Sequence, residues 1–245
     1  MPRRPTVDSA IKRRAAGISC IICAYNEAGR IGQVLSIVLR HPLIDEVVVV
    51  DDGSSDGTRG EVMSHPGAVL ISHDRNRGKS QALAAGIERA GNPVVMVLDA
   101  DLVGLTAADV SALARPVLDD EADVSISLRR NSLPIYKLLG VDFVSGERVF
   151  YKDMLVDHLD ELRALPGFGC EAFMNRVVIE SGRRIAVTRW SGVTHRRKQQ
   201  KSGPWKGMLA EIAMIAAIAK VISLKEILLQ NYVLALAARR GRPQS

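Results

Sequence analysis

Residues 94–101 read Val-Val-Met-Val-Leu-Asp-Ala-Asp, an apolar run that ends in two carboxylates. Five consecutive apolar residues predict a strand that is buried on both faces of a parallel sheet. Ligands of such sheets bind at the carboxyl ends of the strands, and residues i and i+2 of an extended segment point the same way. Asp99 and Asp101 therefore predict a site for a hard divalent cation that bridges to substrate phosphates. The alternative is a polar turn that caps the next helix, with Asp101 in solvent.

Three further apolar runs each end in a polar loop. They lie at 18–23, 46–50 and 68–71, and they lead into the segments 24–27, 51–58 and 73–79. Apolar residues at helical spacing, from Ile31 to Leu39 and from Ala82 to Ile87, predict helices between them. Strands that alternate with helices form βαβ units around a parallel sheet. We therefore expect an α/β fold in which four polar loops meet at one edge of a mostly parallel sheet.

The composition bounds the class of protein and of partner. The chain has 245 residues, enough for one domain with a C-terminal elaboration, and its net charge of +6 favours anionic partners such as nucleotides, phosphate esters or an anionic membrane. Aromatic residues make up only 4%, so stacking platforms for nucleic acid are scarce and no nucleic-acid partner is expected. Three cysteines make no disulfide framework, and the charged N-terminus lacks the apolar core of a secretory signal. We expect a cytoplasmic protein whose cysteines are packing residues.

Four ordered motifs resemble those of family 2 inverting glycosyltransferases. They are IICAYNE at 21–27, VDDGSSDGT at 50–58, NRGK at 76–79 and DAD at 99–101. The resemblance covers roughly residues 17–200, and it is strong to about residue 128. It implies the GT-A nucleotide-diphospho-sugar transferase fold, a mostly parallel sheet with helices on both faces. Two departures are Cys23, where the family often has proline, and Ser80, where a second glycine is frequent.

The resemblance also implies a metal-dependent hexosyltransferase that takes a sugar from a nucleoside diphosphate, with Mg²⁺ or Mn²⁺ as cofactor. Asp51 or Asp52 would accept a hydrogen bond from the base, and Lys79 would reach the nucleotide. The metal, held by the two aspartates of the DAD motif, would stabilise the departing diphosphate as a Lewis acid. The whole expected donor set is Ala24, Tyr25, Glu27, Asp51, Asp52, Lys79, Asp99, Ala100, Arg129 and Arg130. The base itself, uracil or guanine, is left open.

A third candidate metal ligand lies far along the chain. The segment 192–198 resembles the metal-binding histidine region of glucosyl- and mannosyl-3-phosphoglycerate synthases, and it contains His195. It follows a strand-like stretch at 185–188. The expected metal set is therefore Asp99, Asp101 and His195, and the alternative is a structural histidine.

The second half of the chain is expected to select the acceptor. Residues 145–150 resemble the S-G-x-x-x-F segment of polyprenyl-phosphate sugar transferases. A hydroxyl acceptor needs a general base, for which Glu171 and Glu147 are the candidates, with Asp142 behind them.

A phosphate acceptor is already anionic and needs arginines instead of a base. Arg129, Arg130 and Arg148 would supply paired donors, and Arg148 is counted with the catalytic candidates. The alternative is a solvated basic surface. We favour a polyprenyl phosphate as acceptor, and a soluble phosphorylated acid such as 3-phosphoglycerate is the alternative.

Three regions are expected along the chain. They are a basic tail at 1–16, a GT-A domain at 17–200 with a donor-nucleotide half at 17–128 and an acceptor half at 129–200, and amphipathic helices at 201–245. The longest uncharged stretch at the front of these helices is 212–219, which is too short to span a bilayer. Such helices suit a membrane interface on the cytoplasmic face, the edge of the sheet or a homodimer contact, and the last two together are favoured.

Other classes of protein fit less well. Residues 186–190 lack the glutamine of the Q-x-x-R-W motif, which disfavours a processive polysaccharide synthase. A sugar nucleotidyltransferase would need a glycine-rich loop after the first strand, where this chain has CAYN at 23–26. A non-catalytic nucleotide-sugar-binding or membrane scaffold protein remains, and a donor hydrolysis assay with Mn²⁺ or Mg²⁺ separates it from an enzyme.

Overall fold

The computed structural model describes residues 17–132, 134–142, 144–165 and 169–195. The basic tail at 1–16 and the helices at 201–245 expected from the sequence lie outside these residues. Within them, no helix is long and apolar enough to cross a membrane.

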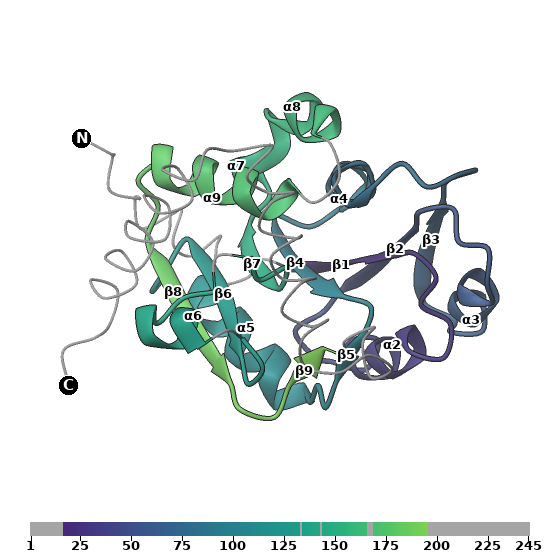
Figure 1. Cartoon of the computed structure of the whole chain (residues 1–245), viewed down its shortest axis with the longest axis horizontal. Coiled ribbons are helices and arrows are strands. Elements are labelled where there is room, and N and C mark those ends of the chain that lie inside the picture. Colours follow the sequence, from purple (N-terminus) through teal and green to yellow (C-terminus); the bar gives the residue numbers. More distant parts are fainter. Residues whose placement is uncertain (1–16, 133, 143, 166–168, 196–245) are drawn as a thin grey trace.

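A seven-stranded mixed sheet forms the framework of the molecule (Figure 1). In spatial order its strands are β3 (Ala68–Ser72), β2 (Glu46–Asp51), β1 (Ile18–Ala24), β4 (Val94–Asp99), β7 (Arg148–Tyr151), β6 (Val124–Arg129) and β8 (Ile185–Trp190). Strand β7 runs antiparallel to both of its neighbours, and the other four pairings are parallel. The predicted α/β fold with a mostly parallel sheet is confirmed.

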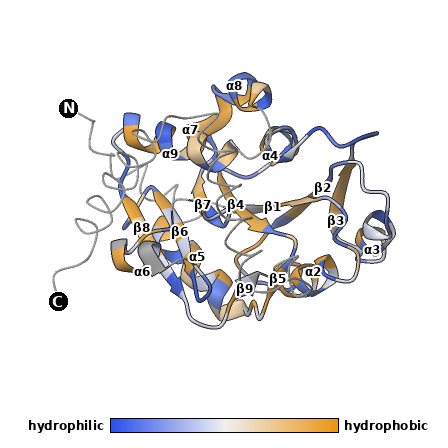
Figure 2. Ribbon diagram, viewed as in Figure 1, coloured by the Kyte–Doolittle hydropathy of each residue, from blue (hydrophilic) through white to orange (hydrophobic). Residues whose placement is uncertain are grey.

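Helices cover both faces of this sheet, as its apolar strands require. One face is covered by α2 (Ile31–Val38), α3 (Thr58–Met63) and α5 (Ala107–Leu118). The other is covered by α4 (Lys79–Arg89), α7 (Asp153–Val156), α8 (Leu159–Ala164) and α9 (Cys170–Glu180), with α6 (Pro134–Leu139) contributing Tyr136. Alternate residues of a strand face opposite sides, so Val97 joins the α4 core and Leu98 the α2 core. Figure 2 shows the hydrophobic residues concentrated along the strands.

A short second ribbon brings a late part of the chain back to the end of β4. Strands β5 (Leu102–Val103) and β9 (Thr194–His195) pair antiparallel, with Leu102 opposite His195. The backbone of His195 therefore lies beside the residue that follows Asp101. No local signal in the sequence predicts this pairing, because the two strands are separated by about ninety residues.

One glycine lets two loops at the carboxyl edge of the sheet touch. Gly53 has a φ of +74°, and a Cβ built on it would lie 2.3 Å from the carbonyl carbon of Arg75. A side chain at Gly53 would therefore collide with the backbone of the neighbouring loop. The close approach fixes the loop after β2 against the loop after β3.

Candidate active site

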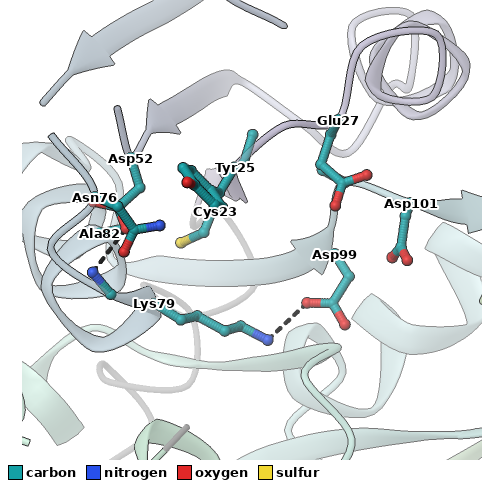
Figure 3. A pocket seen from close by; sticks show the side chains of 12 residues that line it. Cys23, Tyr25, Glu27, Asp52, Asn76, Lys79, Ala82, Asp99 and Asp101 are labelled. Carbon is teal, nitrogen blue, oxygen red and sulfur yellow. Dashed lines mark hydrogen bonds and ion pairs between the residues drawn. The ribbon is translucent and has the colours of Figure 1, made fainter. Parts of the chain in front are cut away.

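A cavity of about 460 Å³ lies at the carboxyl ends of β1, β2 and β4 (Figure 3). Its walls are formed by Cys23, Ala24, Tyr25, Glu27, Asp52, Asn76, Gly78, Lys79, Ala82, Asp99, Ala100 and Asp101. All four sequence motifs contribute to this one cavity, as expected for loops at the same edge of a parallel sheet.

Lys79, the first residue of α4, connects a residue of the expected donor-nucleotide half of the chain with one of the expected acceptor half. Its Nζ donates to Asp99 Oδ1 at 2.8 Å and to Glu171 Oε1 at 2.7 Å, and Figure 3 shows it reaching across the cavity toward Asp99. Burial alone would lower the pKa of Lys79, but the charges of Asp99 and Glu171 raise that pKa well above its usual value. Burial would likewise raise the pKa of Glu171, yet the charge and hydrogen bond of Lys79 lower it. Both side chains are therefore charged at neutral pH.

The structure distinguishes the two aspartates of the VDDGSSDGT motif. Asp51 accepts a hydrogen bond from the backbone N–H of Ser54 and lies at the end of β2. Asp52 lines the cavity and accepts three hydrogen bonds, from the backbone N–H groups of Arg77 and Gly78 and from the His73 ring. Asp52 thus positions the loop that presents Lys79, in addition to facing the cavity.

Two carboxylates at the cavity could hold a cation. Asp99 and Asp101 both line it, and Figure 3 shows them on the same side as Glu27. In the part of the chain that the structure describes, no group of three or more His, Cys, Asp or Glu residues is arranged to hold a metal ion. Mg²⁺ is commonly held by one or two carboxylates together with substrate phosphates and water. The donor set therefore fits a cation that shares its coordination with a phosphorylated ligand.

The third expected metal ligand, His195, has its backbone near this site through the pairing of β9 with β5. Its side chain lies outside what the structure describes, so ligation by His195 stays a prediction.

A buried ion-pair network lies behind Asp99, centred on Arg129. Its Nη1 donates to both carboxylate oxygens of Glu147 at 2.6 Å and lies 4.0 Å from Asp99 Oδ2. Its Nη2 lies 3.8 Å from Asp142 Oδ2. Burial would lower the pKa of Arg129, but these three carboxylates raise it above its usual value. Arg129 is therefore already bound by protein carboxylates.

Glu147, a candidate general base in the sequence, lies wholly inside the protein. It is 0% exposed, and it also accepts hydrogen bonds from the hydroxyls of Ser127 and Ser145 at 2.7 Å. This placement gives Glu147 the role of holding Arg129.

We expect Glu147→Ala to lower the free energy of unfolding by about 3–5 kcal/mol, because removal of one partner leaves the buried guanidinium of Arg129 poorly compensated. Chemical denaturation measures the change. Glu180→Ala, at an exposed glutamate near the end of α9, is the matched control and should change stability little. Equal stability of the two variants would contradict the assignment.

The arginines expected to bind an acceptor phosphate lie in three different environments. Arg148 is 1% exposed, and it donates to the backbone oxygen of Ser145 at 2.9 Å and to Asn175 Oδ1 at 2.7 Å. Desolvation lowers the pKa of Arg148 from its usual value. Arg130 is exposed to solvent at the end of β6, whereas Arg129 is bound by Glu147.

Glu171, the other candidate base, comes from the first turn of α9 and is 8% exposed. One of its oxygens accepts from Lys79, and the other lies 3.0 Å from Cys170 Sγ. Glu171 is therefore connected to the cavity by its hydrogen bond with Lys79, which lines the wall.

Sequence reasoning missed several residues around the cavity. Cys23, interpreted as a packing residue, lies in its wall, where burial raises the pKa of the thiol to about 12 and keeps it protonated. Gly146 lies against the central ion pair, since a Cβ on it would be 2.8 Å from Asp99 Oδ1 and 2.9 Å from Lys79 Nζ. The His73 ring hydrogen-bonds to Asp52, although His73 itself is not among the residues that line the cavity. The serine-glycine pair at 145–146 was a usable signal, whereas nothing local marks His73.

Several known proteins are similar to this chain in sequence or in fold. Residues 19–138 match the model described as glycosyl transferase family 2. Poly-beta-1,6-N-acetyl-D-glucosamine synthase of Staphylococcus epidermidis is 36% identical over 95 residues, which are 37% of this chain and 23% of that protein. The enzyme of the same name from Staphylococcus aureus (strain MW2) is 35% identical over 91 residues, 36% of this chain and 22% of that protein. The chain thus matches less than a quarter of the length of these curated relatives.

Solved structures extend the likeness over nearly the whole chain. Glucosyl-3-phosphoglycerate synthase from Mycobacterium tuberculosis in complex with Mn²⁺, UDP-glucose and phosphoglyceric acid has a TM-score of 0.65 at 21% identity, covering 99% of this chain and 87% of that chain. The same enzyme with Mg²⁺ and UDP has a TM-score of 0.66 at 22% identity, covering 100% and 86%. At these identities the likeness concerns the fold, and the predicted GT-A fold is confirmed.

Proposed function

This chain carries a glycosyl transferase family 2 domain at residues 19–138, and on that premise we propose that it transfers a hexosyl group, with inversion, from a nucleoside-diphosphate sugar. The observation that carries the proposal is the cavity that joins Asp52, Lys79, Asp99 and Asp101 at the carboxyl edge of the sheet. Solved neighbours that hold UDP with Mn²⁺ or Mg²⁺ support the donor class and the cation.

Each wall of the cavity suits one part of such a donor. Asp52 would accept an N–H of the base, and Tyr25, which is 41% exposed, offers an aromatic surface beside it. Asp99 and Asp101 would hold a cation, which when bound supplies Lewis-acid stabilisation of the leaving diphosphate. Lys79 pairs with both Asp99 and Glu171, so its one positive charge offsets only part of their combined negative charge at the centre of the site.

For the acceptor, we propose a hydroxyl group on a phosphorylated molecule, such as a phosphoglycerate. Glu171 is kept ionised by Lys79, as a general base must be, and the neighbour crystallised with phosphoglyceric acid supports this class. The polyprenyl phosphate favoured by the sequence relied on paired arginines. Two of these, Arg129 and Arg148, are already bound by Glu147 and Asn175, which weakens that alternative. Attachment to a membrane surface and a homodimer remain predictions that concern residues 201–245.

The direct test is an assay of the purified full chain with UDP- and GDP-sugars in Mn²⁺ or Mg²⁺, with and without 3-phosphoglycerate or a polyprenyl phosphate. We expect acceptor-dependent release of nucleoside diphosphate, and a product whose anomeric configuration, read by NMR, is opposite to that of the donor. Binding of donor without any turnover would instead support the non-catalytic alternative.

A further inference from the structure

We propose that His73 selects the donor base: by filling one acceptor position of the Asp52 carboxylate, it leaves room for a single N–H and so favours uracil over guanine. The inference rests on the proposed function, because it assigns Asp52 to the base of a nucleoside diphosphate. It adds a residue outside the sequence motifs and outside the cavity wall.

The Asp52 carboxylate has three of its acceptor positions filled by the protein. Oδ1 accepts from His73 Nδ1 at 2.7 Å and from the backbone N–H of Arg77 at 3.0 Å. Oδ2 accepts from the backbone N–H of Gly78 at 2.8 Å. An ionised carboxylate offers about four acceptor positions, two on each oxygen. One position therefore remains, and it belongs to Oδ2, on a residue that lines the cavity.

The position of His73 is set by the backbone. Its N–H donates to the carbonyl oxygen of Asp51 at 2.9 Å, which continues the pairing of β3 with β2. The His73 side chain is only 10% exposed, and the adjoining loop is fixed by the close approach of Gly53 to Arg75. Because a carboxylate only accepts hydrogen bonds, this contact assigns the ring hydrogen to Nδ1.

The bases differ in how many N–H donors they present to this carboxylate, so the carboxylate can discriminate between them. Uracil has one N–H between two carbonyl groups, so it needs one acceptor, and the side-chain amide of Asn76 in the same wall is a donor suited to a carbonyl. Guanine presents two adjacent N–H groups, which would pair with both carboxylate oxygens. Oδ1 is already full, so one guanine N–H would be buried without a partner, which is costly. Adenine and cytosine place a ring nitrogen lone pair against the carboxylate.

Calorimetry on the full chain with Mn²⁺ and the plain nucleoside diphosphates tests this selection. We expect UDP to bind about 10-fold or more tightly than GDP, the factor expected when one buried donor lacks a partner, with CDP and ADP weaker still. GDP binding as tightly as UDP would overturn the role of His73 but leave the proposed function intact. Binding of none of the four would contradict the proposed function itself.

Two variants separate selection from a merely structural role. His73→Ala frees the second position on Oδ1, so we expect the UDP preference to shrink about 10-fold, chiefly through tighter GDP binding. His73→Asn offers an amide N–H near the place of Nδ1 and should retain the preference. His65→Ala, at a half-buried histidine of the α3 C-terminus, is the control that should leave both affinities unchanged. A parallel loss of UDP and GDP affinity in His73→Ala would overturn the proposal, and the wild-type comparison stands if that variant does not fold.

Discussion

Asp101→Ala is expected to abolish the cation-dependent part of nucleoside-diphosphate binding while the protein stays folded. Asp101 lies in the loop after β4, partly exposed in the cavity wall and outside the two hydrophobic cores. When a cation is held by one or two carboxylates and by phosphate oxygens, removal of one carboxylate takes away much of the negative charge that the protein contributes to its binding. Loss of even an outer hydrogen-bonding partner costs about 10–100-fold in metal affinity, so loss of a ligand should cost about 100-fold or more.

The measurement compares UDP affinity in Mn²⁺ with the affinity in EDTA, for the wild type and for the variant. In Asp101→Ala the two values should coincide, whereas in the wild type they should differ. The control is Asp119→Ala, which removes an exposed carboxylate after α5. It changes the net charge by the same amount as Asp101→Ala and should behave as wild type. If Mn²⁺ still increases the UDP affinity of Asp101→Ala over that in EDTA by as much as in the wild type, the assignment of Asp101 as a metal ligand is wrong.

The donor side of this site could be predicted from the sequence because each strand there is a nearly continuous apolar run. The runs at 18–23, 46–50 and 94–98 became β1, β2 and β4 with ends shifted by one residue. Strands buried on both faces need no alternation, so their signal is strong. Parallel order then forces the polar residues that follow them to one edge, which is why Asp52 and Asp99 meet in one cavity.

The acceptor side was less readable because its charged residues are buried. Strand β7 enters the sheet antiparallel between β4 and β6, and it carries Arg148 with Glu147 directly before it. Charged residues usually indicate a surface or a site. Here Glu147 and Arg148 lie in the interior, where Arg129 and Asn175 are their partners. Contacts such as that of Lys79 with Glu171, 92 residues apart, leave no periodic trace in the sequence.

Glu171→Gln is the second variant for which we expect a very large effect. A hydroxyl acceptor must lose its proton as the glycosidic bond forms, and removal of a general base costs about 10²–10⁴-fold in rate. Because Lys79 lowers the pKa of Glu171, the base stays ionised as the pH falls below the ordinary range of a glutamate. The acidic limb of the wild-type rate that belongs to Glu171 should therefore lie below that range. The variant should keep its UDP affinity, since Asp52, Asp99 and Asp101 are unchanged.

The acceptor class is decided by pairing this variant with an arginine variant. Arg148→Ala is unsuitable, because a buried guanidinium bound to Asn175 would lower stability whatever the acceptor is. Arg130→Ala removes instead an exposed arginine that directly follows the end of β6. If the acceptor is a hydroxyl, Glu171→Gln should lose transfer and Arg130→Ala should lose little of its maximal rate. An active Glu171→Gln enzyme, beside an Arg130→Ala enzyme that no longer transfers, would instead mean that the acceptor is a phosphate, which is already anionic and needs no base.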